Sequence, residues 1–331
     1  TFPRSGNHSM AQLGLGMASL GRPGYINLGH GQDLKHDYSI ESVRRNAFKV
    51  LDKAWQAGIR HFDVARSYGR AEEFVSQWIS DKSITPHNIT VSSKWGYTYT
   101  AAWKVQTPKG VAHEVKRHEL PVLQRQYATS LRQLGEHLKI YQIHSATRES
   151  GVLKNHAVLD FLGRIHQTGM SIGLSVSGPT QSETIEEALT IEVNGERLFQ
   201  SVQATWNLLE RSAEPALQKA HDHGLRVIIK ESVANGRLTS RNQCPNFHSK
   251  KEQLRQLAHN HQSTIDAISI AAAMNRPWAD VVLSGATTPA QVESNIMANT
   301  LQWDEKLECQ TAKFAETSTD YWNSRAQLTW N

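Results

Sequence analysis

The chain has 331 residues, of which 39% are hydrophobic and 20% charged, and its net charge is +5. This composition is typical of a globular enzyme, and no apolar run approaches the roughly 18 residues that a membrane-spanning helix needs. Lysine and arginine are dispersed without a basic block, which argues against nucleic acid and for a small-molecule partner.

Two cysteines, Cys244 and Cys309, are too few for a disulfide framework. A reducing compartment is therefore expected, by default the cytoplasm, and a monomer is the default oligomeric state. The first residues lack the apolar core of a signal peptide. Because the sequence does not begin with methionine, an organellar location after removal of an upstream segment stays open.

Short apolar segments alternate with longer amphipathic ones along the chain. Apolar residues recur with helical spacing over residues 40–57, and Gly58 then supplies the glycine that ends many helices. The same rhythm predicts strands at residues 13–17, 59–63, 90–94, 140–144, 171–175, 201–204, 226–230 and 281–285. It predicts helices at residues 40–57, 71–79, 120–134, 158–167, 180–190, 214–223, 263–274 and 288–299.

Eight short apolar strands without strict alternation are typical of a parallel sheet covered by helices. We therefore predict a (β/α)₈ TIM barrel, a single domain with extended loops at its C-terminal face. The barrel is expected over residues 13–331, after an N-terminal tail of residues 1–12. No composition break or Pro/Ser-rich linker indicates a second domain.

Gly14 and Gly16 in the first predicted strand invite comparison with a dinucleotide-binding fingerprint. The third glycine of that fingerprint is replaced by Ser19, and Pro23 prevents the helix that should follow. The favoured interpretation is a glycine-rich strand end that lets a ligand approach the backbone.

Polar residues stand at the C-terminal ends of the second to eighth predicted strands. In a barrel these ends face the mouth that holds the active site. One polar terminus alone is usually a helix cap or a satisfied core residue, but such a series is not a core pattern. The residues are Asp63, Lys94, His144, Ser175, Gln203, Lys230 to Ser232, and Ser284.

Asp63, Tyr68, Lys94 and His144 in one mouth are suited to proton transfer to a carbonyl group. A tyrosine with its pKa near about 10 is a poor acid at neutral pH. A lysine cation nearby lowers that pKa, and an aspartate keeps the lysine charged. A histidine can orient the carbonyl oxygen through a hydrogen bond. Singly, each has a structural explanation; together they indicate an active site with Tyr68 as proton donor.

These residues resemble a known family. Asp63-x₄-Tyr68, Ser93-Lys94 and Ile143-His144 look like the catalytic tetrad of the aldo-keto reductase superfamily. The resemblance extends from about residue 13 to residue 298. It implies reversible NADPH-dependent reduction of an aldehyde or ketone to the alcohol, with NAD as a possible cofactor and no metal.

The resemblance also implies roles for individual residues. Tyr68 would be the general acid, Lys94 and Asp63 would lower its pKa, and His144 would orient the carbonyl group. The implied cofactor-binding residues are Ser175, Gln203, Ser232, Gly236, Leu238, Gly285, Thr287, Gln291 and Asn295.

The cofactor-binding pattern departs from the family at several positions. Val176 stands where an asparagine usually follows the serine, and Glu231 lies near the position of an aromatic residue that stacks on nicotinamide. Gln291 replaces an arginine that grips the adenosine 2′-phosphate, and Gly285 replaces a lysine. Two other cations, Arg237 and Lys230, are candidates to replace these charges.

Aromatic residues near the predicted strand ends are candidates for substrate contacts. Trp95 and Tyr97 follow the third strand, and Trp206 follows the sixth. Arg66, between Asp63 and Tyr68, is a candidate contact for an anionic substrate. The alternatives are that the aromatic residues pack the loops on the barrel and that Arg66 pins its loop.

Two other classes of function are considered. A cofactor-sensing regulatory subunit could keep the same barrel with little turnover. A metal hydrolase is disfavoured because His221-x-His223 and His259-x-His261 lie on predicted helices. There, side chains two residues apart point about 200° away from each other, so one metal ion cannot easily use both.

Overall fold

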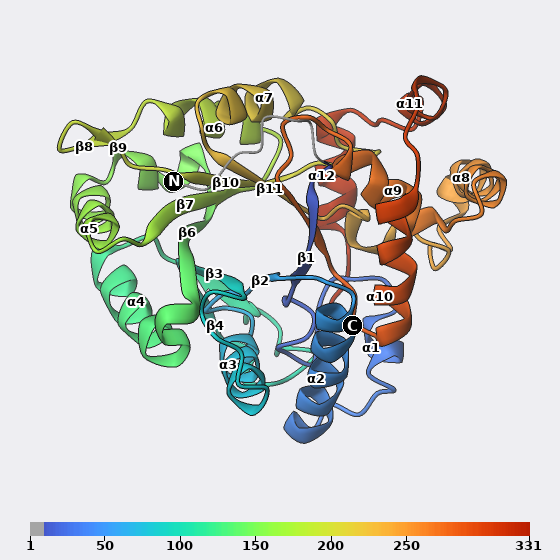
Figure 1. Ribbon diagram of the computed structural model, residues 1–331. Coiled ribbons are helices and arrows are strands. Elements are labelled where there is room, and N and C mark those ends of the chain that lie inside the picture. Colours follow the sequence, from blue (N-terminus) through green and yellow to red (C-terminus); the bar gives the residue numbers. More distant parts are fainter. Residues whose placement is uncertain (1–9) are drawn as a thin grey trace.

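The computed structural model describes residues 10–331, so most of the predicted tail, residues 1–9, lies outside the described residues. Eight parallel strands form a closed barrel ringed by helices, as Figure 1 shows. The predicted (β/α)₈ barrel is confirmed. Its strands are β1 (Gln12–Gly16), β2 (His61–Asp63), β3 (Thr90–Trp95), β6 (Leu138–Ala146), β7 (Ser171–Val176), β10 (Ser201–Thr205), β11 (Arg226–Lys230) and β12 (Val281–Ser284).

The helices that follow the strands cover the outside of the barrel. In the first of them, α2, the apolar residues at helical spacing are buried, and the Ser39 side chain caps the N-terminus. Within residues 10–331, no helix is both long and apolar enough to cross a bilayer. These outer helices are α2 (Ile40–Gln56), α3 (Ala71–Asp81), α4 (Leu120–Leu134), α5 (His156–Gln167), α6 (Gln181–Leu189), α7 (Glu214–Asp222), α9 (Ile265–Met274) and α10 (Pro289–Ile296).

Further elements occur in the loops, where the sequence has no long apolar period. The C-terminal helix α12 lies beside the barrel opening (Figure 1). These elements are α1 (His30–Asp33), the hairpin β4 (Tyr97–Tyr99) with β5 (Glu114–Lys116), the hairpin β8 (Glu192–Val193) with β9 (Glu196–Arg197), α8 (His248–Asn260), α11 (Glu305–Ala312) and α12 (Ser318–Ala326).

The strand β6 carries a bulge at its C-terminal end. Ile143 pairs with Leu174 and Ala146 with Val176, so β6 has one residue more than β7 over this stretch. Ser145 in the bulge has a φ of 51°, a left-handed conformation that is uncommon for a residue other than glycine. Both His144 and Ser145 line the cavity at the barrel mouth because the bulge redirects the strand there.

The loop after β1 contacts the loop after β2 at Gly21. The Arg70 amide donates a hydrogen bond to the Gly21 carbonyl oxygen at 2.7 Å. A Cβ atom at Gly21 would overlap the backbone oxygen of Tyr68 and atoms of Ala71. Glycine is therefore required for the close approach that fixes the Tyr68 loop.

We expect Gly21→Ala to lower the free energy of unfolding by roughly 1–3 kcal/mol, because the added methyl group must push backbone aside. Urea denaturation would measure this change. Gly16→Ala is the matched control, because its Cβ would meet nothing closer than 3.6 Å. Equal stability of the two variants would contradict the proposed contact.

Candidate active site

Asp63, at the end of β2, is the centre of a buried polar network. Its carboxylate forms an ion pair with the ammonium group of Lys94, and both side chains are almost completely buried. The Ser92 hydroxyl donates to Oδ1 at 2.7 Å, and the Gln203 amide donates to the same oxygen at 3.0 Å. These partners satisfy a carboxylate that would otherwise be costly to bury.

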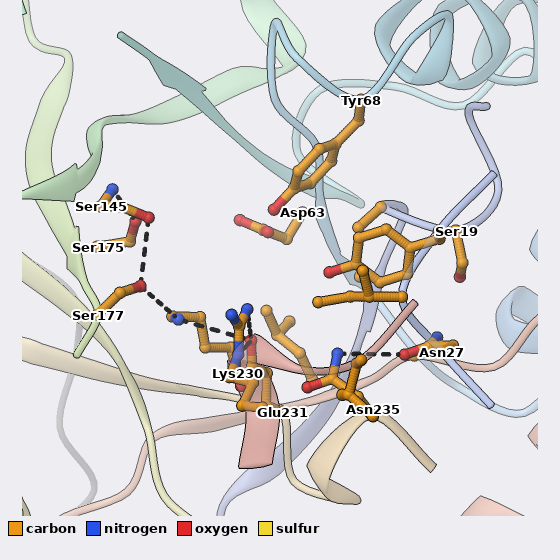
Figure 2. Close-up of a pocket in the computed structure, with 18 of the residues that line it drawn as sticks. Ser19, Asn27, Asp63, Tyr68, Ser145, Ser175, Ser177, Lys230, Glu231 and Asn235 are labelled. Carbon is orange, nitrogen blue, oxygen red and sulfur yellow. Dashed lines mark hydrogen bonds and ion pairs between the residues drawn. The ribbon is translucent and has the colours of Figure 1, made fainter. Parts of the chain in front are cut away.

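Tyr68 lies next to this ion pair. Its hydroxyl is 3.4 Å from the Lys94 ammonium nitrogen, and its ring lies 5.5 Å from the His144 ring, centroid to centroid. Figure 2 shows the Tyr68 hydroxyl directed toward Asp63 at one side of the cavity. The structure therefore brings together the side chains of Asp63, Tyr68, Lys94 and His144.

The surroundings of Tyr68 keep its hydroxyl protonated. Burial, and next the Asp63 carboxylate, hold the pKa of Tyr68 well above its usual value, while Arg22 acts in the opposite direction. This is opposite to the lowering expected from Lys94, because Asp63 neutralises that ammonium group directly. Tyr68 is thus in its acid form at neutral pH.

His144 is a neutral imidazole at neutral pH. Burial, and next the positive charge of Lys94, hold the pKa of His144 well below its usual range. The Ser67 hydroxyl lies 3.5 Å from His144 Nδ1. A neutral imidazole can accept a hydrogen bond at one ring nitrogen and donate one from the other.

A cavity of about 380 Å³ opens beside Tyr68 and His144. This volume lies within the range of small-molecule sites. Aromatic rings, polar side chains and glycine backbone all contribute to its lining. The residues in these three groups are Tyr25, Tyr97 and Trp330; Ser145, Ser175, Ser177, Lys230 and Glu231; and Gly16 and Gly285.

The polar side chains of the lining form a wall in which successive residues are connected by hydrogen bonds (Figure 2). The Ser145 amide donates to the Ser175 hydroxyl at 2.8 Å, and the Ser145 and Ser177 hydroxyls lie 3.2 Å apart. Lys230 donates to the Ser177 hydroxyl at 3.1 Å. Burial lowers the pKa of Lys230 to about 8, with Glu231 opposing the shift. This wall offers both donors and acceptors to a ligand.

Arg325 of α12 enters the cavity and pairs with Glu231. Arg325 Nε donates to the two carboxylate oxygens at 3.0 and 2.9 Å, and Nη2 lies 2.5 Å from Oε1. Burial opposes ionisation of Glu231, but Arg325 and Lys230 outweigh it and hold its pKa at about 2. The Arg325–Glu231 ion pair thus lines the cavity close to the sequence position where the family resemblance implies an aromatic residue stacked on nicotinamide.

The implied cofactor-binding residues are distributed unevenly around the cavity. Most of those at the strand ends line it, whereas Gly236 packs against Leu28 and Leu238 is fully buried in the core. The lining residues among them are Ser175, Gln203, Ser232 and Gly285.

Thr287, Gln291 and Asn295 do not line the cavity. The Thr287 amide donates to Gln291 Oε1 at 2.7 Å. Asn295 is connected to the cavity wall separately, because the Ser284 hydroxyl donates to Asn295 Oδ1 at 2.6 Å and Ser284 lines the cavity.

Of the four predicted substrate contacts, one lines the cavity and three do not. Tyr97 lines the cavity with its ring 4.8 Å from the His144 ring. Trp95 and Trp206 are fully buried in the hydrophobic core and do not line the cavity. Arg66 is also outside the cavity and forms an ion pair with the buried Glu72. Packing and the ion pair therefore account for these three residues.

Residues outside the barrel strands complete the cavity and were not identified from the sequence. Arg22 Nη1 donates to Glu114 at 2.8 Å, and its guanidinium lies 4.8 Å from the Tyr25 ring centroid and 5.4 Å from the Tyr68 ring centroid. Trp330 reaches the cavity from beyond α12. Of these residues, only Arg22 could have been expected near the cavity from its position in the sequence, because it follows the glycine-rich end of the first strand.

The two His-x-His pairs lie away from the cavity. His221 belongs to α7 and His259 to α8, and neither lines the cavity. In the described part of the chain, no three His, Cys, Asp or Glu side chains lie close enough together to hold a metal ion.

Comparisons with known proteins identify the family and the fold. A profile of the Aldo/keto reductase family matches residues 12–310. The uncharacterized oxidoreductase YqkF of Bacillus subtilis (strain 168) is 24% identical over 211 residues, which cover 61% of this chain and 61% of YqkF. The NADH-specific methylglyoxal reductase of Escherichia coli (strain K12) is 24% identical over 319 residues, which cover 88% of this chain and 90% of that protein. The holo structure of the aldo-keto reductase AKR11C1 from Bacillus halodurans matches with a TM-score of 0.69 and 19% identity, over 93% of each chain.

The chain therefore belongs to the aldo/keto reductase family, whose members are oxidoreductases that use nicotinamide cofactors. The likeness to AKR11C1, at 19% identity, shows the barrel fold alone. The predicted family, fold and oxidoreductase class are confirmed. The substrate and the roles of individual residues stay predictions.

We expect Arg325→Gln to lower the free energy of unfolding by roughly 3 kcal/mol at pH 7, because it leaves the Glu231 carboxylate buried without its partner. The pKa of Glu231 is depressed in the folded chain, from 4.5 to about 2. Its stabilising contribution is therefore present above pH 4.5 and lost as the pH falls toward 2. The difference between variant and parent should shrink over that range.

Urea denaturation at pH 7 and at about pH 3.5, between the unfolded pKa of 4.5 and the folded pKa of about 2, would measure the effect. Arg255→Gln is the matched control, because it removes an arginine from the exposed Arg255–Glu252 pair on α8. That variant should leave stability nearly unchanged. A loss of stability in Arg325→Gln that is independent of pH would contradict the role of the Glu231 charge.

Proposed function

We propose that this cavity catalyses reversible reduction of an aldehyde or ketone to the alcohol, with Tyr68 as the proton donor. The observation that carries the proposal is the contact of the Tyr68 hydroxyl with Lys94, whose charge is balanced by Asp63. It combines a protonated acid at the cavity wall with a fixed cation beside it. Hydride is supplied by the nicotinamide cofactor when it is bound.

The residues around the cavity fit a nicotinamide. Ser175 and Gln203 offer the polar groups that a carboxamide needs, and both line the cavity. A Cβ added to Gly285 would meet only Asn27, at 3.9 Å, so a ligand can approach the backbone there. Asn235 also lines the cavity, and its buried Oδ1 has no hydrogen-bond partner within residues 10–331. These groups would hold and orient the cofactor.

The proton transfer follows from the environment of Tyr68. Its hydroxyl would donate to the carbonyl oxygen, leaving a phenolate that the ammonium group of Lys94 stabilises. The neutral imidazole of His144 would donate a hydrogen bond to the same oxygen and orient it. The Tyr68 hydroxyl is protonated at neutral pH, so it has a proton to donate, and the Lys94 ammonium group offsets the cost that burial adds to forming the phenolate.

The cofactor implied by the resemblance is NADPH, with NADH as the alternative. The E. coli relative is named as NADH-specific, so both dinucleotides are kept as candidates here. That relative's name also describes reduction of a small carbonyl compound, which supports the substrate class. The aromatic side chains of Tyr25, Tyr97 and Trp330, which line the cavity, would suit substrates with an apolar or aromatic body.

The cavity is lined by residues from Gly16 to Trp330, so we treat residues 13–331 as one functional domain. Cys244 and Cys309 are both exposed and unpaired. These thiols support the expectation of a reducing, cytoplasmic setting. A monomer remains the expected oligomeric state.

We expect Tyr68→Phe to reduce kcat for reduction of an aromatic aldehyde by at least about 100-fold, because the proton donor is removed. The dissociation constant of the dinucleotide should change little, because the phenol ring is kept. Absorbance of the reduced cofactor at steady state would follow turnover, and calorimetry would follow binding.

Tyr127→Phe is the matched control, because Tyr127 packs against Tyr141 and is not part of the cavity wall. It should keep full turnover. Undiminished kcat in Tyr68→Phe would remove Tyr68 from the reaction. A parent protein that binds dinucleotide but reduces no compound in a panel of aldehydes, ketones and sugars would favour a cofactor-sensing subunit instead.

A further inference from the structure

The Asp33 carboxylate gathers hydrogen-bond donors beside the segment 285–295. The Thr287 hydroxyl donates to it, and the Gln291 amide donates at 3.0 Å. Arg241, from the loop after β11, forms an ion pair with the same carboxylate, with Nη1 at 2.8 Å from Oδ2. The Asp33 side chain is only 6% exposed, so its charge depends on these partners rather than on water.

The family resemblance implies that the segment from Gly285 to Asn295 holds the adenosine 2′-phosphate, and Asp33 accepts hydrogen bonds from Thr287 and Gln291 of that segment. The neighbouring Thr288 hydroxyl accepts from the backbone amide of Gln291 at 3.3 Å and caps α10. Arg241, the cation that Asp33 holds beside Thr287 and Gln291, already forms an ion pair with Asp33.

Arg237 and Lys230, the two candidates to replace the missing positive charges, contact other residues. Arg237 Nη2 donates to both carboxylate oxygens of Glu316, at 2.7 and 2.9 Å. Lys230 donates to Ser177 and Thr205, each at 3.1 Å. Neither replaces the arginine and lysine that are missing from the segment 285–295.

The segment just before Asp33 is packed against the loop after β11. Gly29 has a φ of 77°, and a Cβ there would lie 2.9 Å from Arg241 Nη1, so glycine permits the close packing of Arg241. The Leu28 amide donates to the Asn235 carbonyl oxygen at 3.0 Å, and Asn235 Nδ2 donates to Asn27 at 3.3 Å (Figure 2). These contacts tie the segment before Asp33 to the loop after β11.

We propose that Asp33 makes the enzyme prefer NADH to NADPH. The Asp33 carboxylate would repel a 2′-phosphate. The phosphate would also have to compete with this carboxylate for the donors of Thr287, Gln291 and Arg241. The free 2′-hydroxyl of NADH can instead donate a hydrogen bond to a carboxylate, the arrangement that selects NAD in other dinucleotide sites. This inference rests on the proposed function, since it takes the segment 285–295 as the adenosine end of the cofactor site.

Calorimetric titration of the full chain with NADH and with NADPH, without a carbonyl substrate, tests the preference directly. We expect the unchanged protein to bind NADH at least about tenfold more tightly. Asp33→Asn should tighten NADPH binding at least about tenfold, because it removes the repulsion and frees Arg241. NADH binding should change less, since the asparagine side chain still accepts a hydrogen bond.

Two further variants define the mechanism. Asp37→Asn removes the same charge from an exposed position of the same loop, and it should leave the ratio of the two dissociation constants unchanged. Asp33→Asn combined with Arg241→Gln should lose much of the gained NADPH affinity, because the freed cation is then absent.

Equal or tighter binding of NADPH by the unchanged protein would overturn the inference, and this result needs no variant to fold. An unchanged ratio in a folded Asp33→Asn protein, or the same shift in Asp37→Asn, would also overturn it. If neither dinucleotide binds the unchanged protein, the proposed function itself fails. That outcome is distinct from binding with the opposite preference.

Discussion

The buried ion pair of Lys94 and Asp63 is the interaction on which the barrel mouth depends. An unpaired charge at this depth would be strongly destabilising, so each group requires the other. The remaining acceptor capacity of Asp63 is filled by Ser92 and Gln203. Asp63 and its partners come from β2, β3 and β10, so the buried charges are satisfied only when the barrel is closed. The same requirement puts the cation beside the Tyr68 hydroxyl.

Three further arginines near the barrel mouth are each neutralised by a carboxylate of their own. Arg22 pairs with Glu114, Arg241 with Asp33, and Arg325 with Glu231. Each arginine lies outside the barrel strands and is joined to an acid from another part of the chain. An anionic ligand therefore meets arginines that are already neutralised. The modest positive charge of the whole chain says little about which ligand the site accepts.

Residues at the strand ends could be predicted because a barrel brings those ends to one face, whatever the loops do. The placement of Asp63, Lys94 and His144 followed from this rule. The aromatic residues were harder to place. Trp95 follows Lys94 on the same strand, and successive side chains of a strand point to opposite faces, so one faces the mouth and the other the core. A loop interpretation of Trp95 missed this alternation.

The sequence alone determined the alternation of strands and helices, the barrel and the family, because periodicity and strand-end chemistry are local properties. Only the tertiary structure decided what surrounds those strand ends. Asp33, Arg241 and Arg325 act through partners distant in the sequence, and no local pattern records such pairings. Tertiary structure also decided the direction of the pKa shift of Tyr68, because burial, which raises this pKa, depends on the packing of several separate loops.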